Sequence, residues 1–200
     1  MKAKKYRFLG IITTVLCLCL TWGQLRSQIT QASEVNSINS RTEIASTWQY
    51  ASFPVDNFQS YTSPFGYRIS PTSGKKQFHR GIDMAAPMGS YIRNWWTGKV
   101  IGVSDHTACG TMVKIQSGRW KHVYCHMMGH IERNDNGIYL IDREGGIQIW
   151  QGQEIPVGAP IGRVGMTGRT TGPHLHWGLM YDNAYIDPAG VLKAMNKIKA

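Results

Sequence analysis

The 200-residue sequence has few acidic side chains, few cysteines and no long apolar run. Asp and Glu number 12 against 22 Lys and Arg, so the formal net charge is +10. No arginine-rich stripe or nucleic-acid motif accompanies this charge, so we expect no nucleic-acid partner. The four cysteines form no CxxC pair, which makes them weak candidates as metal ligands. No internal repeat is present.

The longest uncharged, mostly apolar run is thirteen residues, from Phe8 to Leu20. It is shorter than the roughly 20 residues that a membrane span requires, and it follows a basic start. This pattern is typical of a secretory signal peptide, which predicts residues 1–23 as a signal. Cleavage after Gly23 is consistent with the small residues Thr21 and Gly23. An uncleaved N-terminal anchor is the alternative, and it would be the sole contact with a membrane.

A signal predicts an exported protein, which is periplasmic, associated with the cell wall or extracellular. Removing the segment takes away four basic and no acidic residues, which lowers the net charge from +10 to +6. Such a charge suits an anionic surface such as a cell wall, although it also serves solubility. An exported compartment permits a disulfide between Cys109 and Cys125, the two cysteines outside the signal. Two buried free thiols are the alternative.

The rest of the chain divides by composition. Residues 24–48 are polar without an apolar period and are interpreted as a linker. The domain follows at 49–192, and 193–200 form a C-terminal tail. A short helix is predicted near this end, with one apolar side made of Val191, Leu192 and Met195.

No twelve-residue stretch of the domain has a helical period; instead, short apolar runs are separated by glycines. The predicted strands are 99–104, 111–116, 121–127, 137–142, 146–150 and 174–180. Turn residues at Ser117–Gly118 and at Arg143–Gly145 predict hairpins over 111–127 and 137–150. Successive strands of this kind indicate a mainly β, compact antiparallel fold.

Histidines and one aspartate supply the candidate chemistry. His79 and Asp83 are four residues apart and can share one metal ion, with Gly81 letting the backbone bend between them. In the strand from 174, alternation places His174 and His176 on one face. The opposite face is apolar, so the two histidines should point into a groove or solvent.

A third group lies in the strand 121–127, where alternation places His122, Tyr124 and His126 on one face. From the residues alone, His126 can be a metal ligand, a catalytic group or a structural histidine. Two imidazoles and one carboxylate form a ligand set that leaves one zinc position open, as catalytic sites require. A zinc ion in such a site lowers the pKa of a water molecule to about 7.

The sequence resembles the lysostaphin/LytM-type zinc metallopeptidases, which are murein endopeptidases. The order and spacing of the motifs agree over about residues 60–190. The matching segments are Ser63–Arg68, Gly74, His79–Pro87, Tyr124–His126, Gly158–Gly168, Thr170–His176 and Asp187–Pro188.

This resemblance implies one zinc ion per chain, bound by His79, Asp83 and His176. It implies that His126 and His174 are catalytic, without saying which of them is the general base. It also implies an antiparallel β domain with the metal in a groove. The expected partner is the peptide part of peptidoglycan, either stems with their cross-links or glycine bridges. We expect a monomer.

Three features depart from the family pattern. Residues 128–153 are longer than the usual connection and are interpreted as an inserted hairpin that forms one groove wall. The pair Trp95–Trp96 replaces smaller residues and is interpreted, with Tyr124, as a candidate groove wall, packing being the alternative. Cys109 and Cys125 lie on the two arms of the predicted hairpin, so a bridge between them depends on the strand register.

The function predicted from these residues is an exported zinc metalloendopeptidase acting on peptidoglycan. One alternative is a non-catalytic relative that binds the wall or activates another hydrolase; another is a general exported protease acting on glycine-rich proteins. The sequence does not indicate which bond is cut, or whether a partner or latency controls activity.

Overall fold

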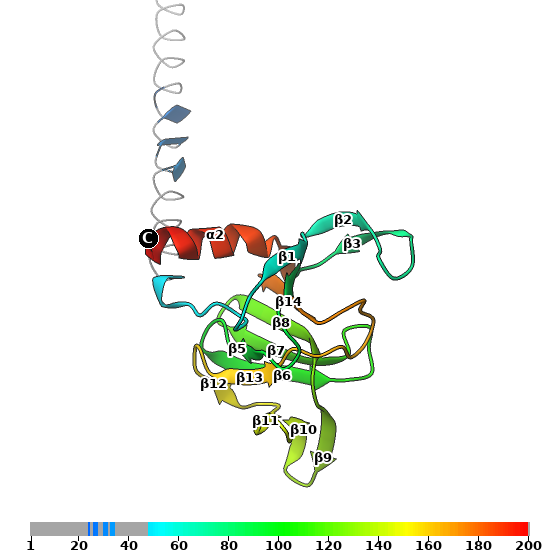
Figure 1. The fold of residues 1–200 in the computed structure, drawn as a ribbon. Coiled ribbons are helices and arrows are strands. Elements are labelled where there is room, and N and C mark those ends of the chain that lie inside the picture. The colour runs from blue at the N-terminus through cyan, green and yellow to red at the C-terminus, as the bar shows by residue number, and fades with distance from the viewer. Residues whose placement is uncertain (1–23, 25, 28–29, 32, 35–47, 200) are drawn as a thin grey trace, which may run out of the picture. The chain divides into compact units, whose positions relative to one another are not determined.

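A computed structural model describes residues 24, 26–27, 30–31, 33–34 and 48–199 (Figure 1). The predicted signal, 1–23, lies outside the described residues. Within the predicted linker, the described residues between 24 and 34 are helical, and they belong to a unit distinct from the one that begins at Trp48. Across the described part of the chain, no helix combines the length and apolarity needed to cross a membrane.

The unit from Trp48 onward is built around one antiparallel sheet of eight strands, which confirms the predicted fold class (Figure 1). In spatial order the strands are β1 (Ser60–Ser63), β4 (Ile82–Ala85), β14 (His174–Tyr181), β8 (Trp120–Met127), β7 (Thr111–Ser117), β6 (Gly98–Ser104) and β12 (Glu154–Ile155). The eighth strand, β15 (Ala184–Ile186), also pairs with β14. Antiparallel pairing suits these short strands because tight turns can join neighbours.

Smaller elements surround this sheet. They are the hairpin β2 (Gly66–Ile69) and β3 (Lys76–His79), the pair β5 (Tyr91–Arg93) and β13 (Pro160–Arg163), the three-stranded sheet β9 (His130–Asn134), β10 (Gly137–Asp142) and β11 (Ile147–Trp150), the 3₁₀ turn η1 (Trp48–Tyr50) and the helix α2 (Pro188–Lys199). The β2–β3 hairpin and the three-stranded sheet lie at opposite ends of the domain (Figure 1).

All six predicted strands are present with nearly the expected bounds. The first predicted hairpin turns one residue later than expected, because Ser117 pairs with Trp120 and the turn is Gly118–Arg119. Gly118 has a φ of 58°, which only glycine adopts at little cost. The second hairpin turns between Asp142 and Ile147, as predicted.

The core lies on one face of the main sheet. Leu175, Trp177 and Leu179 are completely buried, as alternation along β14 predicts. The ring of Trp95 makes edge contacts with Trp177, and its Nε1 donates to Sδ of Met195 in α2. The helix therefore closes one side of this core.

Helix α2 begins with favourable capping residues. Asp187 accepts a hydrogen bond from the backbone of Ala189, and Pro188 occupies the first helical position. The three apolar residues predicted to share one side of this helix are all buried: Val191, Leu192 and Met195.

Residues 128–153 form the three-stranded sheet β9–β11 rather than a simple hairpin. Leu140, Ile147 and Ile149 from this sheet are buried in the common core. Asp142 accepts two hydrogen bonds from the guanidinium of Arg163, which attaches the sheet to β13. This insertion is therefore an integral part of the domain.

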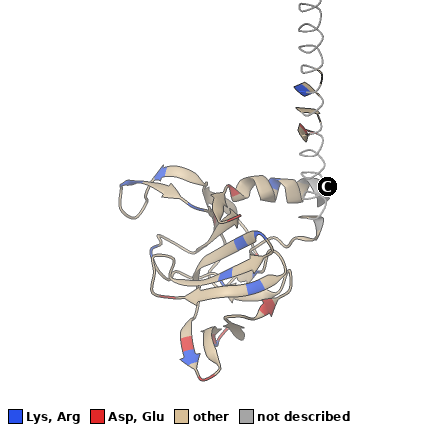
Figure 2. Ribbon diagram, turned by 180° about the vertical axis from the view of Figure 1, so that it is seen from behind, with Lys and Arg blue, Asp and Glu red and all other residues tan. Residues whose placement is uncertain are grey.

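Basic side chains in the described part of the chain are spread over the β2–β3 hairpin, the main sheet and the three-stranded sheet (Figure 2). They do not gather into one stripe, so the charge acts as a diffuse field.

Candidate metal and catalytic site

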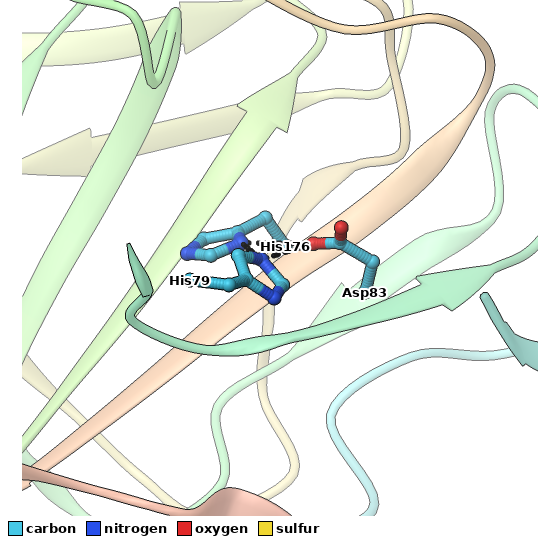
Figure 3. Close-up of side chains that lie close together, drawn as sticks. All are labelled: His79, Asp83 and His176. Atoms are coloured by element: carbon cyan, nitrogen blue, oxygen red, sulfur yellow. Dashed lines mark hydrogen bonds and ion pairs between the residues drawn. The ribbon is translucent and has the colours of Figure 1, made fainter. Parts of the chain in front are cut away.

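The pairing of two strands brings the first three candidates together. In the ladder between β14 and β4, His176 lies directly opposite Asp83. His79 reaches the same point from the end of β3. Asp83 Oδ1 lies 3.0 Å from Nε2 of His79 and 2.8 Å from Nδ1 of His176, and these two nitrogens are 2.9 Å apart (Figure 3).

These three atoms suit a cation. Nδ1 of His79 donates a hydrogen bond to the carbonyl of Pro64 at 2.7 Å, so Nε2 of the neutral ring carries a lone pair. That lone pair faces a carboxylate oxygen and a second imidazole nitrogen, with all three ligand atoms within 4.8 Å of one another. A divalent ion satisfies such converging acceptors, and two imidazoles with one carboxylate are a zinc-binding set.

The carboxylate of Asp83 is held in its charged form. Burial raises its pKa, but close contacts with the imidazoles of His176 and His79 outweigh this effect and place the pKa far below its usual range. Burial lowers the pKa of His176, although Asp83 opposes the effect. An ionised carboxylate beside neutral imidazoles is the protonation state in which a metal binds.

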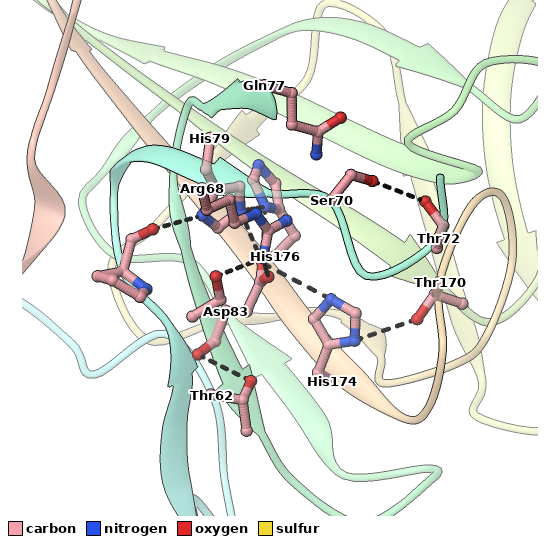
Figure 4. A network of polar contacts seen from close by, with 12 residues as sticks. Thr62, Arg68, Ser70, Thr72, Gln77, His79, Asp83, Thr170, His174 and His176 are labelled. Carbon is pink, nitrogen blue, oxygen red and sulfur yellow. Dashed lines mark hydrogen bonds and ion pairs between the residues drawn. The ribbon is translucent and has the colours of Figure 1, made fainter. Parts of the chain in front are cut away.

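Arg68 orients this carboxylate from the other side. Its Nη1 donates to Oδ2 of Asp83 at 3.0 Å and also to the hydroxyl of Ser63 (Figure 4). Oδ1 is thereby left to the two histidines. Arg68 is not among the predicted site residues, although it belongs to the Ser63–Arg68 motif that matches the family.

Gly81 makes room for the site, a role that differs from the expected bend. A Cβ at this position would lie 2.7 Å from Cε1 of His176 and 2.6 Å from the carbonyl oxygen of Trp177. Any larger residue would displace the imidazole, so glycine is required by close approach.

His174 lies beside the metal ligands. Its Nδ1 donates to the carbonyl of Gly172 at 2.9 Å and is 3.2 Å from the hydroxyl of Thr170 (Figure 4). This bond fixes the tautomer and leaves Nε2, which is 3.6 Å from Oδ1 of Asp83.

His126 reaches the site from β8 through an irregular backbone. The ladder between β7 and β8 is irregular here: the two-residue step from Thr111 to Val113 in β7 pairs with a three-residue step from Met127 to Tyr124 in β8. Within that stretch, His126 has a φ of 62°. Its Nδ1 donates to the carbonyl of Thr167 at 2.8 Å, and its ring centroid lies 4.8 Å from that of His174. Burial lowers the pKa of His126 to about 4, so its ring is neutral at neutral pH.

The five residues face a pocket of about 640 Å³. Its walls come from the β2–β3 hairpin, the loop before β7 and the loop before β14. Residues contributing to these walls include Thr62, Arg68, Pro71, Thr72, Gln77, Phe78, Arg80, Ala108, Cys109, Arg169, Thr170 and Thr171.

Two expectations about the groove walls are wrong. Trp95 and Tyr124 are completely buried and Trp96 packs against the same core, so none of them lines the pocket. The inserted segment 128–153 also contributes no residue to the pocket, because it packs against β6 and β13 instead.

The face expected for His122, Tyr124 and His126 is also divided. His122 is completely buried, with Nε2 2.9 Å from the hydroxyl of Ser117 and Nδ1 2.8 Å from that of Tyr124. The regular part of β8 points this face into the core. The irregular step near Cys125 redirects His126 alone toward the pocket.

Cys109 and Cys125 form a disulfide, with Cα atoms 5.0 Å apart. Both line the pocket, and Cys125 precedes His126. The structure thus contains the bridge that the sequence left open.

An antiparallel β domain with a His–Asp–His cluster and two further histidines is the arrangement expected of a metallopeptidase. Comparison with known proteins agrees, since residues 77–188 match peptidase family M23. The peptidoglycan DD-endopeptidase ShyB of Vibrio cholerae is 31% identical over 137 residues, which cover 68% of this chain and 28% of that protein.

Solved structures give the same result. A zinc-containing peptidase from Vibrio cholerae aligns with a TM-score of 0.52 and 30% identity, covering 72% of this chain and 38% of that one. The catalytic domain of lysostaphin from Staphylococcus simulans has a TM-score of 0.54 and 21% identity over 69% of this chain and 94% of that domain, a likeness in fold alone.

The family match covers more than half of the chain, so the protein belongs to peptidase family M23. The resemblance to LytM-type peptidases is thereby confirmed. The chain spans little more than a quarter of the length of ShyB.

Proposed function

We propose that this protein is an exported zinc metalloendopeptidase that hydrolyses peptide bonds in peptidoglycan. The observation that carries the proposal is the convergence of His79, Asp83 and His176 in an open pocket that also contains His126 and His174. A non-catalytic relative has no need of all five groups.

The proposed ligands are Nε2 of His79, Oδ1 of Asp83 and Nδ1 of His176, for one zinc ion per chain. When bound, zinc acts as a Lewis acid that polarises a carbonyl and makes a nucleophile available at neutral pH. Arg68 orients Asp83 by donating a hydrogen bond to its Oδ2. The carbonyl of Pro64 orients His79 by accepting a hydrogen bond from its Nδ1.

His126 and His174 are proposed to handle protons. Each ring donates its Nδ1–H to a backbone carbonyl, so each offers Nε2 to the pocket. An unprotonated Nε2 can accept the proton of an attacking water, and a protonated one can donate to the oxyanion that develops on the peptide carbonyl.

The charge of the pocket favours acidic peptides. Arg68, Arg80 and Arg169 line it, with Asp83 as the one acidic side chain among its lining residues. Peptide stems that carry free carboxylates would complement this field better than neutral glycine bridges. The DD-endopeptidase activity in the name of the relative ShyB supports the same substrate class.

Export is part of the proposal and rests on residues 1–23 as a signal, 24–48 as a linker and 49–192 as the peptidase domain. The Cys109–Cys125 disulfide supports it, because disulfides persist in oxidising compartments.

The test uses the purified zinc-loaded protein on isolated peptidoglycan, with mass analysis of the released fragments. We expect fragments whose new ends mark one type of peptide bond, no release after chelation, and recovery on return of zinc. A glycine-rich peptide incubated in parallel should be cut more slowly than an acidic stem peptide. Release that persists in chelator, or no release with one zinc bound, contradicts the proposal.

A further inference from the structure

The Cys109–Cys125 disulfide adjoins His126, one of the two histidines proposed to handle protons. It joins the loop 105–110 to β8, and Cys125 immediately precedes His126. Cys125 is buried, and both cysteines contribute to the pocket wall. The bridge therefore attaches a surface loop to the point where the strand ladder is irregular.

The backbone of His126 needs such support. Its φ of 62° lies in the left-handed region, which costs energy for any residue with a side chain, so surrounding contacts must hold it there. Its N–H donates to the carbonyl of Cys109 at 2.8 Å, and its own carbonyl accepts from Gly165 at 2.9 Å. One of these two bonds thus comes from the residue that the disulfide fixes in place.

The imidazole depends on the same loop. Nδ1 of His126 donates to the carbonyl of Thr167, and the next residue, Gly168, packs so closely on Gly110 that a Cβ on either glycine would collide with the other loop. The backbone of Arg169 also donates to Ala108 at 2.9 Å. The loop 105–110 is therefore packed against the segment that anchors the ring.

We propose that the Cys109–Cys125 disulfide positions His126. It holds the loop 105–110 in place, and that loop fixes both the left-handed backbone of His126 and the Thr167 carbonyl that orients its ring. Cys109 and Cys125 are positioning residues, since their proposed effect on catalysis is exerted through His126. The proposal rests on the catalytic role of His126 in the proposed function.

The first test observes His126 without requiring activity. Two-bond proton–nitrogen NMR spectra of the zinc-loaded protein, labelled at histidine nitrogens, report the tautomer of each ring. In the oxidised protein we expect one fixed Nδ1–H tautomer for His126. After reduction with dithiothreitol, and in the Cys109→Ala/Cys125→Ala variant, we expect its signals to broaden or move to averaged values. His122, at the other end of β8, is the internal control and should not change.

The second test measures turnover. We expect kcat on wall fragments to fall about 10- to 100-fold in the double variant, with KM and zinc content little changed, because a misplaced proton-transfer group slows chemistry rather than binding. Ile149→Ala is the stability control. It opens a cavity in the inserted segment, which contributes no residue to the pocket, and its kcat should match the wild type at temperatures below its melting temperature.

Unchanged His126 signals after reduction overturn the proposal. An equal loss of kcat in Ile149→Ala also overturns it, because the bridge would then act through stability alone. If the oxidised protein hydrolyses no wall material, the proposed function fails, and the His126 signals still decide the positioning claim.

Discussion

Nε2 of His79 lies 2.9 Å from Nδ1 of His176, although 97 residues separate them in the chain. Asp83 touches both nitrogens with one oxygen. Three groups that ordinarily accept hydrogen bonds are thus held together by β3, β4 and β14.

Gly81→Ala should weaken zinc binding at least about 10-fold, which is the size of effect seen when the orientation of a metal ligand is disturbed. The added methyl group would lie 2.7 Å from the ring of His176, so the ring or the strand must move. Competition with a chelating dye measures the affinity. Gly102→Ala is the matched control, because a Cβ there meets no atom within 4 Å. Equal affinities for both variants would contradict the geometry.

Replacing a proposed ligand should abolish metal binding. We expect about one zinc per wild-type chain and almost none for Asp83→Ala or His176→Ala, because two remaining ligands hold zinc weakly. Elemental analysis after dialysis measures the content, and circular dichroism verifies the fold. Retention of a full equivalent in Asp83→Ala would show that the metal lies elsewhere.

His126→Ala and His174→Ala should separate chemistry from metal binding. Each should keep about one zinc and lose about 10²- to 10⁴-fold in wall hydrolysis, the range that general acid–base groups contribute. Their Nδ1 atoms are fixed on backbone carbonyls, whereas Nε2 faces the pocket. The double variant should be little worse than the poorer single variant, since both act in one step. Wild-type rates in either single variant would remove these residues from the mechanism.

Arg68→Met should reduce zinc affinity or activity about 10- to 100-fold, because Oδ2 of Asp83 loses its partner and the carboxylate can rotate. Arg68→Lys keeps the charge and should recover part of the loss. If Arg68→Met binds zinc and hydrolyses walls like the wild type, the arginine has no orienting role.

Stability should fall in acid through His122. Burial lowers the pKa of this imidazole to about 3 in the folded protein, against 6.5 for an ordinary histidine. Between these values the unfolded chain binds a proton that the folded chain does not. The contribution of the neutral His122 ring to the free energy of unfolding is therefore complete above about pH 6.5. It is lost as the pH falls toward 3, at up to about 1.4 kcal/mol per pH unit.

Urea unfolding at a series of pH values measures this slope. In His122→Gln the free energy of unfolding should depend less steeply on pH, by the equivalent of about one proton. His106→Gln, which removes an exposed imidazole, should have the same pH dependence as the wild type. His126 has a lowered pKa as well and contributes with the same sign, so the difference between variants isolates His122. Equal slopes for His122→Gln and the wild type would mean that the ring is not buried neutral.

The sequence by itself determined what depends on short-range order. The alternation in β14 separates Leu175, Trp177 and Leu179 from His174 and His176, because successive side chains in a strand point to opposite faces. Short apolar runs separated by glycines placed the six strands, and turn residues placed both hairpins. The two histidines and the aspartate were selected as candidate ligands because they occupy the ligand positions that the resemblance to LytM-type peptidases implies.

Only the tertiary structure decided which surfaces are covered. Alternation groups His122 and Tyr124 correctly, but whether that face meets solvent depends on Trp95, which is far away in the chain. The irregular step at Cys125 and His126 reverses the alternation for one residue, and no local pattern announced it. Long-range packing also decides three further features: the hydrogen bond from Arg68 to Asp83, the disulfide, and the placement of residues 128–153 away from the pocket. Local sequence fixes the direction of a side chain along its strand; what lies in that direction is fixed by the rest of the fold.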